Sequence, residues 1–264
     1  MSPEPSAPRV LALVVPEISL QRMLRTRAGH GPLAVVDDGM VLHCNGPARA
    51  AGVRPGDSLV QARAACAGLE ALPLDRAADR KALQALAEAM LALAPAVEVG
   101  EEALLLDAGA AGVATPGAPR GDGEAYLAGR ALELARRLGY EARAAVADGK
   151  GPAGALARSA GRALVVPPGE TARALADLPL EALGLPAAAL VRLAAVGVRG
   201  VGALQALLVA AGWLFAGRSA LGLPSADLAA ATASAFAGGA LLLPLLVLLL
   251  RAPLEAVLGL ASDL

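Results

Sequence analysis

Two adjacent carboxylates, Asp37 and Asp38, have the residue types and the spacing of a general acid and base acting together. They stand directly before Gly39, and an Asp-Gly pair between two apolar runs is a strong signal for a β-hairpin turn. Turn formation accounts for both residues without any catalytic role. We therefore predict a hairpin over residues 34–44, with these carboxylates at its turn.

A second cluster that could do chemistry is the glycine-lysine-glycine run at residues 149–151. Glycine-rich loops of this kind bind phosphates through backbone N–H groups, with a lysine and a hydroxyl residue at fixed positions. Here Ala144 takes the position of the first glycine, and Gly151 takes that of the hydroxyl residue. The run is therefore not predicted to be a phosphate-binding loop.

Cysteine and histidine are too few to indicate a metal site or a disulfide scaffold. The chain contains only Cys44, Cys66, His30 and His43, and their spacing matches no zinc-binding pattern. We predict no resident metal from these residue types. The formal net charge of −1 also argues against a broad basic surface. Any contact with nucleic acid must therefore be local or supplied by a partner.

The elements that must position functional residues follow from apolar periodicity and turn signals. In chain order we predict a strand at 10–15, a helix at 19–27, the hairpin at 34–44, two short helices between 45 and 66, a helix at 76–94, a strand at 99–109, a helix at 124–138, a strand at 141–147 and a helix at 152–160. This order predicts an α+β palm with a small helical insertion, rather than a doubly wound sheet. Strands 10–15 and 102–107 should be neighbours, and helices 76–94 and 124–138 should pack on one face.

The two ends of the chain differ from this palm. Residues 1–8 are polar and proline-rich, so we predict that they are disordered and form no signal peptide, which implies a cytoplasmic protein. Residues 179–210 are predicted to be helical, with a tight turn at 197–202. Residues 211–264 form an apolar tail, and its uncharged tract at 228–250 is long enough to span a bilayer. A divergent helical tail, a tail altered by a frame disruption and a membrane-inserted helix are all compatible with this composition.

Three segments carry a more specific pattern. The segment from Asn45 to Leu74 contains Asn45, Gly46, Pro47, Ala48 and Arg49, followed by Gly52-Val53-Arg54 and Gly56. In this order and spacing it resembles the fingers of Y-family translesion DNA polymerases of the UmuC and DinB type. Residues 143–158 and 178–204 resemble ImuB, the polymerase-like branch of that family in bacterial mutagenesis cassettes. The resemblance covers about residues 9–205 and implies a palm over 9–178, with a fingers insertion at about 33–75 and a thumb-like helical region at 179–210.

The resemblance also indicates which carboxylates matter, because nucleotidyl transfer uses two metal ions held by acids on neighbouring palm strands. In active relatives the first strand ends in an Asp-x-Asp cluster. Here Val15 takes the position of the principal acid, and Glu17 aligns with the second. The remaining acids correspond either to Glu102 and Ala103 or to Glu101 and Glu102, and the sequence leaves both registers open. Because Val15 offers no ligand, the resemblance implies a degenerate site that binds no metal.

Two arginines and a glycine-rich turn are the other candidates that the resemblance supplies. Arg49 stands where the family's fingers arginine grips the incoming triphosphate, and Arg158 stands at a later basic position, although Gly46 replaces the family's tyrosine. The structural alternative is that both are solvated helix arginines. The turn at 197–202 resembles the helix-hairpin-helix of the thumb, whose N–H groups bind a DNA phosphate, with helix packing as the alternative. The candidate DNA contacts are Gly197, Arg199, Gly200 and Gly202.

With the principal acid missing, the resemblance implies a non-catalytic, polymerase-like adaptor in error-prone translesion DNA repair of the SOS response. Its implied partners are a RecA-like accessory protein, an error-prone replicative-type polymerase and the sliding clamp, with weak binding to DNA. The family's little-finger domain and clamp-binding peptide are not recognisable, so we expect a C-terminally truncated member. Two alternatives are a weak polymerase that uses Glu17, Glu101 and Glu102 with Mg²⁺, and a membrane-associated protein with a vestigial palm.

Overall fold

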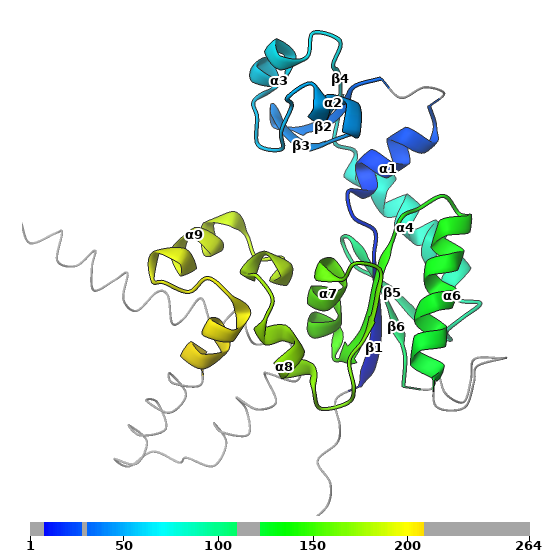
Figure 1. The fold of residues 1–264 in the computed structure, drawn as a ribbon. Helices are drawn as coiled ribbons and strands as arrows, with labels where there is room; N and C mark the ends of the chain where they lie inside the picture. Colours follow the sequence, from blue (N-terminus) through cyan, green and yellow to red (C-terminus); the bar gives the residue numbers. More distant parts are fainter. Residues whose placement is uncertain (1–7, 28–30, 110–121, 209–264) are drawn as a thin grey trace, which may run out of the picture. The chain divides into compact units, whose positions relative to one another are not determined.

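The computed structural model describes residues 8–27, 31–109 and 122–208 (Figure 1). The expected disorder at the N-terminus, apart from Pro8, and the apolar tail at 211–264 lie outside the described residues. Within the described ranges, none of the helices has the length and the apolar character needed to cross a membrane.

The chain forms two compact units. The first unit consists of Leu13–Leu106 and Ala110–Ala144, and the second consists of Met1–Ala12, Asp107–Gly109 and Ala145–Leu264. The candidate acids and Arg49 belong to the first unit. Arg158 and the glycine-rich turn belong to the second.

A five-stranded sheet has the strand order β5-β6-β1-β7-β8. Strand β1 lies between β6 and β7, and its residues from Val10 onward are buried, as expected for an apolar strand covered on both faces. The predicted neighbourhood of strands 10–15 and 102–107 is therefore confirmed. The bounds of the strands are β1 Arg9–Val14, β5 Val97–Val99, β6 Ala103–Asp107, β7 Arg143–Asp148 and β8 Ala163–Val165.

The prediction of one continuous strand at 99–109 is wrong, because this segment belongs to a hairpin. β5 and β6 pair antiparallel, with Val99 opposite Leu104. The N–H of Gly100 donates to the carbonyl of Ala103 at 2.8 Å and closes a tight turn that carries Glu101 and Glu102. Successive side chains of a strand point to opposite faces, so a continuous strand would turn one of these two carboxylates toward the core. The turn leaves both exposed.

Helices α4 (Arg76–Met90) and α6 (Gly123–Arg137) contact each other in the first unit. Figure 1 shows them side by side, which agrees with the prediction that both pack on one face. α4 ends at Met90, four residues before the predicted end. Pro95 disfavours helical geometry at the residue before it, and the N–H groups of Leu93 and Ala94 both return to the Met90 carbonyl. The chain therefore leaves the helix through a turn.

Residues 33–73, here called the small-sheet segment, form three strands and two short helices. The strand order is β3-β2-β4, with β2 and β3 antiparallel and β2 and β4 parallel. The φ angles of 48° at Asp38 and 75° at Gly39 confirm the predicted hairpin turn. The segment has its own core, which includes Ala34, Cys44, Ala48 and Val53. The bounds are β2 Leu33–Asp37, β3 Met40–Cys44, α2 Gly46–Ala50, α3 Leu59–Ala65 and β4 Glu70–Pro73.

After β7 the second unit is mostly helical. Gly197 ends the helix before the predicted turn with φ 81°, and its N–H donates to the Ala194 carbonyl while that of Val198 donates to the Leu193 carbonyl. This is the Schellman arrangement that favours glycine at the position after a helix. Residues 201–208 form the next helix. The other bounds are α7 Lys150–Ser159, α8 Thr171–Ala176, the 3-10 helix η1 Leu180–Leu183 and α9 Ala187–Ala195.

Candidate functional site

Val15 stands at the end of the central strand, at the position where the family's principal acid is expected. It has no exposed surface. Its N–H donates to the carbonyl of Glu102 at 3.1 Å, so the first palm strand and the β5–β6 turn meet at this point. The valine side chain is a hydrocarbon and offers no lone pair to a cation. The backbone geometry therefore matches a palm site, whereas one of its two ligand positions is apolar.

Glu17 is the N-cap residue of α1 (Ile18–Arg25) and adopts a left-handed backbone, with φ 50° and ψ 41°. For a residue other than glycine this conformation costs about 1–2 kcal/mol. Its carboxylate accepts a hydrogen bond from Nη2 of Arg49 at 2.7 Å, and Nδ1 of His43 lies 3.9 Å from the same oxygen. The carboxylate of Glu17 is thus hydrogen-bonded to Arg49, and the imidazole of His43, also in the small-sheet segment, lies close to the same oxygen.

The residues at this site do not fit the two Mg²⁺ ions that a Y-family polymerase fold implies. Such a pair needs carboxylates from both neighbouring strands. Val15 has no donor atom, Glu17 is paired with Arg49, and Glu101 and Glu102 both belong to one exposed turn. Among the residues that the structure describes, no three His, Cys, Asp or Glu side chains are grouped so that they could hold a metal ion.

Arg49 is held in a defined place but remains partly open to solvent. Hydrogen bonding to the Cys44 side chain and the negative charge of Glu17 keep the pKa of Arg49 above its usual value. The guanidinium side chain is 47% exposed. A guanidinium has five N–H donors in a planar fork, and Glu17 engages only part of them.

Asn45 explains how the small-sheet segment positions Arg49. Its buried Oδ1 accepts hydrogen bonds from the N–H of Ala48 at 3.1 Å and from the N–H of Leu33 at 3.0 Å. Its Nδ2 donates to the carbonyl of Gly31 at 2.8 Å. One side chain therefore caps α2 and ties it to the start of β2. The asparagine of the fingers-like motif thus has a structural role that fixes the helix on which Arg49 stands.

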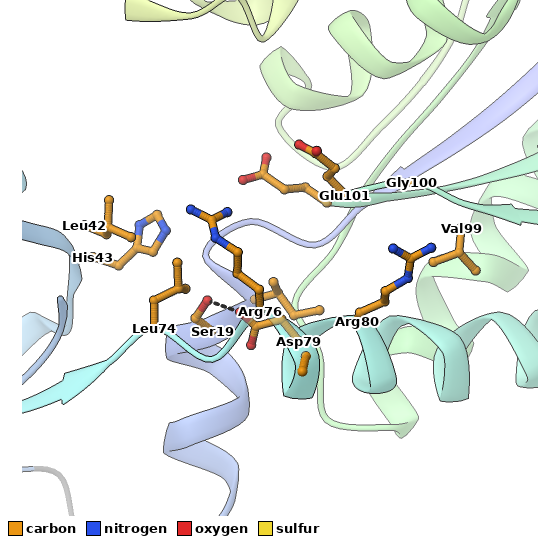
Figure 2. A pocket seen from close by; sticks show the side chains of 13 residues that line it. Ser19, Leu42, His43, Leu74, Arg76, Asp79, Arg80, Val99, Gly100 and Glu101 are labelled. Atoms are coloured by element: carbon orange, nitrogen blue, oxygen red, sulfur yellow. Dashed lines mark hydrogen bonds between the residues drawn. The ribbon is translucent and has the colours of Figure 1, made fainter. Parts of the chain in front are cut away.

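A pocket of about 740 Å³ opens in the first unit between the small-sheet segment, the start of α4 and the β5–β6 turn. In Figure 2, His43 lies on one wall, Arg76 and Arg80 rise from α4, and Glu101 lies across from Arg76. The pocket is thus lined by charges of both signs. The sequence did not identify the two arginines, because a pair four residues apart on a helix is typical of a solvated face.

A buried ion pair supports the floor of this pocket. Asp79 is 6% exposed and accepts hydrogen bonds from Oγ of Ser19 at 2.5 Å and from Nε of Arg22 at 2.9 Å. These bonds join α1 to α4 across a sequence separation of about 60 residues. The pairing left no local signal in the sequence.

Arg158 contacts the backbone of its own unit. Its Nη1 donates to the carbonyl of Ala182 in η1 at 3.3 Å. A Cβ atom at Gly184, where φ is 67°, would lie 3.3 Å from the guanidinium carbon. The guanidinium of Arg158 therefore packs against Gly184, where the absence of a side chain leaves room for it. Arg158 is thus not the fully solvated helix arginine of the structural alternative.

The glycine-rich turn packs against the segment before η1. The N–H of Val201 donates to the carbonyl of Leu178 at 2.9 Å, and Gly200 forms an isolated antiparallel bridge with Pro179. The N–H groups of Gly197, Val198 and Val201 in the candidate DNA-binding turn therefore already donate to carbonyls inside the protein, while Arg199 is exposed.

Gly202 is required by close packing. A Cβ atom there would lie 2.9 Å from the backbone carbonyl oxygen of Ala176, which cannot move aside like a flexible side chain. We expect Gly202→Ala to lower the free energy of unfolding by about 1–3 kcal/mol in chemical denaturation. In α6, Gly129→Ala is the matched control, because nothing lies within 4 Å of the added Cβ. It should raise stability by about 0.5–1 kcal/mol, and equal effects of the two substitutions would contradict the packing argument.

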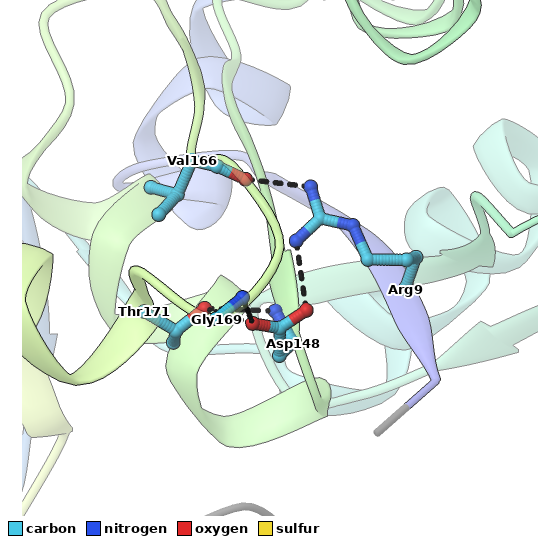
Figure 3. Close-up of polar contacts among 5 residues, drawn as sticks. All are labelled: Arg9, Asp148, Val166, Gly169 and Thr171. Atoms are coloured by element: carbon cyan, nitrogen blue, oxygen red, sulfur yellow. Dashed lines mark hydrogen bonds and ion pairs between the residues drawn. The ribbon is translucent and has the colours of Figure 1, made fainter. Parts of the chain in front are cut away.

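A second polar cluster, which the sequence did not indicate, lies in the second unit (Figure 3). Oδ1 of Asp148 accepts from Nη1 of Arg9 at 2.9 Å, and Oδ2 accepts from the N–H of Gly169 and the hydroxyl of Thr171, both at 2.8 Å. Nη2 of Arg9 donates to the carbonyl of Val166 at 2.6 Å. Asp148 therefore joins the start of β1, the end of β7 and the loop before α8, and its role is structural.

Comparison with known proteins agrees with this geometry. Residues 18–153 match a family model described as the impB/mucB/samB family. The chain is 38% identical over 157 residues to the protein ImuB of Caulobacter vibrioides, from strain NA1000 / CB15N and equally from strain ATCC 19089. This alignment covers 59% of the chain and 33% of ImuB, so the chain corresponds to about a third of the length of these relatives.

Solved structures of DNA polymerases share the fold. A post-insertion binary complex of Dbh DNA polymerase matches with a TM-score of 0.57 and 19% identity, over 92% of this chain and 67% of that one. DinB from Sulfolobus solfataricus matches with a TM-score of 0.54 and 18% identity, over 73% and 58% of the two chains. At these identities the likeness supports the α+β polymerase-type fold and not the activity.

Proposed function

Because this chain belongs to the impB/mucB/samB family, we propose that it is a non-catalytic Y-family polymerase homologue that acts as an adaptor in error-prone translesion DNA repair. The observation that carries the proposal is Val15. A buried hydrocarbon stands at the strand end where nucleotidyl transfer needs a carboxylate, directly beside the turn that supplies Glu101 and Glu102. The polymerase-type fold is retained, while one side of the metal-binding donor set is missing.

The proposed division of the chain follows the family. Residues 9–178 act as palm and fingers, with the small-sheet segment as the fingers, and residues 179–210 act as the thumb-like region. Gly197, Arg199, Gly200 and Gly202 are proposed to contact DNA weakly through the exposed arginine and the remaining N–H groups of the turn. Arg49 is proposed as a residual phosphate contact. Arg158 contributes mainly by fastening α7 to η1.

The proposed partners come from the ImuB relationship and not from a surface of this structure. They are a RecA-like accessory protein, an error-prone replicative-type polymerase and the sliding clamp. An adaptor role of this kind is compatible with the low formal net charge of −1, because the DNA-binding charge is then supplied by the partners.

Primer extension tests the loss of catalysis. With Mg²⁺ or Mn²⁺, the full chain is expected to give no extension of a primed template above a no-enzyme control, while an active Y-family polymerase extends it in parallel. The double substitution Glu101→Ala and Glu102→Ala should change nothing in this assay. It should also leave any complementation of mutagenesis in cells intact. Template-dependent extension that disappears in the double variant would instead identify a divergent polymerase that uses these acids.

A further inference from the structure

We propose that Glu17 is a specificity-determining residue: its carboxylate competes with polyphosphate ligands for the Arg49 guanidinium and thereby weakens their binding to the small-sheet segment. The inference deepens the proposed function, and it rests on that function only in taking the small-sheet segment as the fingers. It concerns which anion Arg49 binds and is independent of whether any nucleotide is ever transferred.

The contacts around Glu17 are those of a bound anion. Nη2 of Arg49 lies 2.7 Å from Oε1 of Glu17, a short distance typical of a charge-assisted hydrogen bond. The imidazole of His43 approaches the same oxygen to 3.9 Å. Both basic groups come from the small-sheet segment, whereas Glu17 comes from the start of α1. A carboxylate of the chain itself therefore lies where two basic side chains converge.

The backbone indicates that Glu17 is held in this position by its surroundings. Glu17 and Asp38 are the two residues other than glycine with positive φ in the described part of the chain. Asp38 belongs to a hairpin turn, in which a positive φ is expected. Glu17 belongs to no hairpin, and unfavourable backbone angles persist where the surrounding contacts enforce them. The ion pair with Arg49, at 2.7 Å, is the shorter of the two contacts described above for the Glu17 side chain, against 3.9 Å for the approach of His43.

Carboxylate and phosphate oxygens compete for the same guanidinium donors. A polyphosphate could use the exposed part of Arg49, but to gain the donor that Glu17 occupies it would have to displace the carboxylate. The pocket that His43 lines also carries the negative charges of Glu101 and Glu102, which do not favour a further anion there. No group of described residues is arranged to hold a metal ion that would neutralise these charges. Removing the carboxylate of Glu17 should therefore strengthen the binding of anions to Arg49.

The test is calorimetric titration of the full chain with sodium tripolyphosphate, without divalent cations and at low salt. Glu17→Gln keeps the shape of the side chain and removes its charge, and it should tighten binding roughly two- to fivefold over the wild type. The gain should shrink at high salt and vanish in the double variant Glu17→Gln with Arg49→Gln. Glu70→Gln is the matched control, because Glu70 forms a similar exposed pair, with Arg27 at 2.6 Å, and lies outside the pocket lining. It should leave binding unchanged.

Glu17→Gly provides a second route, because glycine adopts the left-handed backbone without strain and also removes the carboxylate. It should tighten tripolyphosphate binding to the same extent as Glu17→Gln. Equal binding by the wild type and both Glu17 variants, or a gain that persists without Arg49, would overturn the inference. Neither outcome depends on primer extension. A wild-type chain that synthesises DNA would contradict the proposed function. The role of Glu17 would still be tested separately by the tripolyphosphate titrations.

Discussion

Asp79→Asn is expected to lower the free energy of unfolding by about 3 kcal/mol, because it breaks a buried ion pair. The carboxylate of Asp79 is buried and holds both Ser19 and Arg22. Asparagine keeps the size of the side chain but leaves the Arg22 guanidinium without its counter-charge. Because the Arg22 side chain is 24% exposed, water relieves part of this cost, so the loss should fall near the lower end for a broken buried pair.

Chemical denaturation of the full chain measures this loss, and Asp37→Asn is the matched control. Asp37 also pairs with an arginine of α4, Arg76 at 3.0 Å, but the Arg76 side chain is 79% exposed. An exposed pair contributes less than about 1 kcal/mol, so Asp37→Asn should be nearly neutral. Similar losses from the two substitutions would mean that burial does not distinguish these ion pairs.

Asp148→Asn is expected to lower the free energy of unfolding by about 2–3 kcal/mol, because one carboxylate accepts from the Arg9 guanidinium, from the N–H of Gly169 in the loop before α8 and from the hydroxyl of Thr171 at the start of α8. Burial raises the pKa of Asp148, but the hydrogen bonds from Arg9, Gly169 and Thr171 outweigh burial and hold the pKa below its usual value. The charged form is therefore favoured in the folded state.

The direction of this pKa change fixes the pH dependence. A carboxyl group whose pKa is depressed by folding stabilises the protein above its ordinary pKa of about 3.9, and this contribution is lost as the pH falls through the lower, folded value. The difference in unfolding free energy between wild type and Asp148→Asn should therefore be constant near neutral pH and shrink below about pH 4. A difference that grows on acidification would contradict the assignment.

The elements that could be predicted from the sequence are those with local signals. The hairpin turn at Asp38-Gly39 and the helix end at Gly197 both depend on residues whose backbone preferences act within a few positions. The β5–β6 hairpin was missed because its turn, Gly100-Glu101-Glu102, contains no Asn-Gly or Asp-Gly pair, and the apolar run that follows it is typical of a single strand. The turn forms where Val99 pairs with Leu104. This pairing between strands depends on the folded sheet, and local backbone preferences do not determine it.

The candidate site was predictable only where a position could be compared with a family. Val15 could be assigned in this way, and its place beside Glu102 agrees with the expected meeting of the two palm strands. The contact of Arg49 with Glu17 could not be predicted, because each residue was compared with a ligand-binding position and not with the other. The same holds for Asp79, whose partners lie on another helix. Pairs formed across the fold leave no periodicity in the sequence.

The central place of β1 in the sheet has a consequence for folding during synthesis. β1 ends at Val14, but its neighbours β6 and β7 begin only at Ala103 and Arg143. Until both have left the ribosome, an apolar strand has two unpaired edges, the state most prone to pairing with other chains. The small-sheet segment pairs within residues 33–73 and closes much shorter loops. We therefore expect this inserted segment to pair before β1 does, and β1 to be a stretch of the nascent chain that a chaperone would protect.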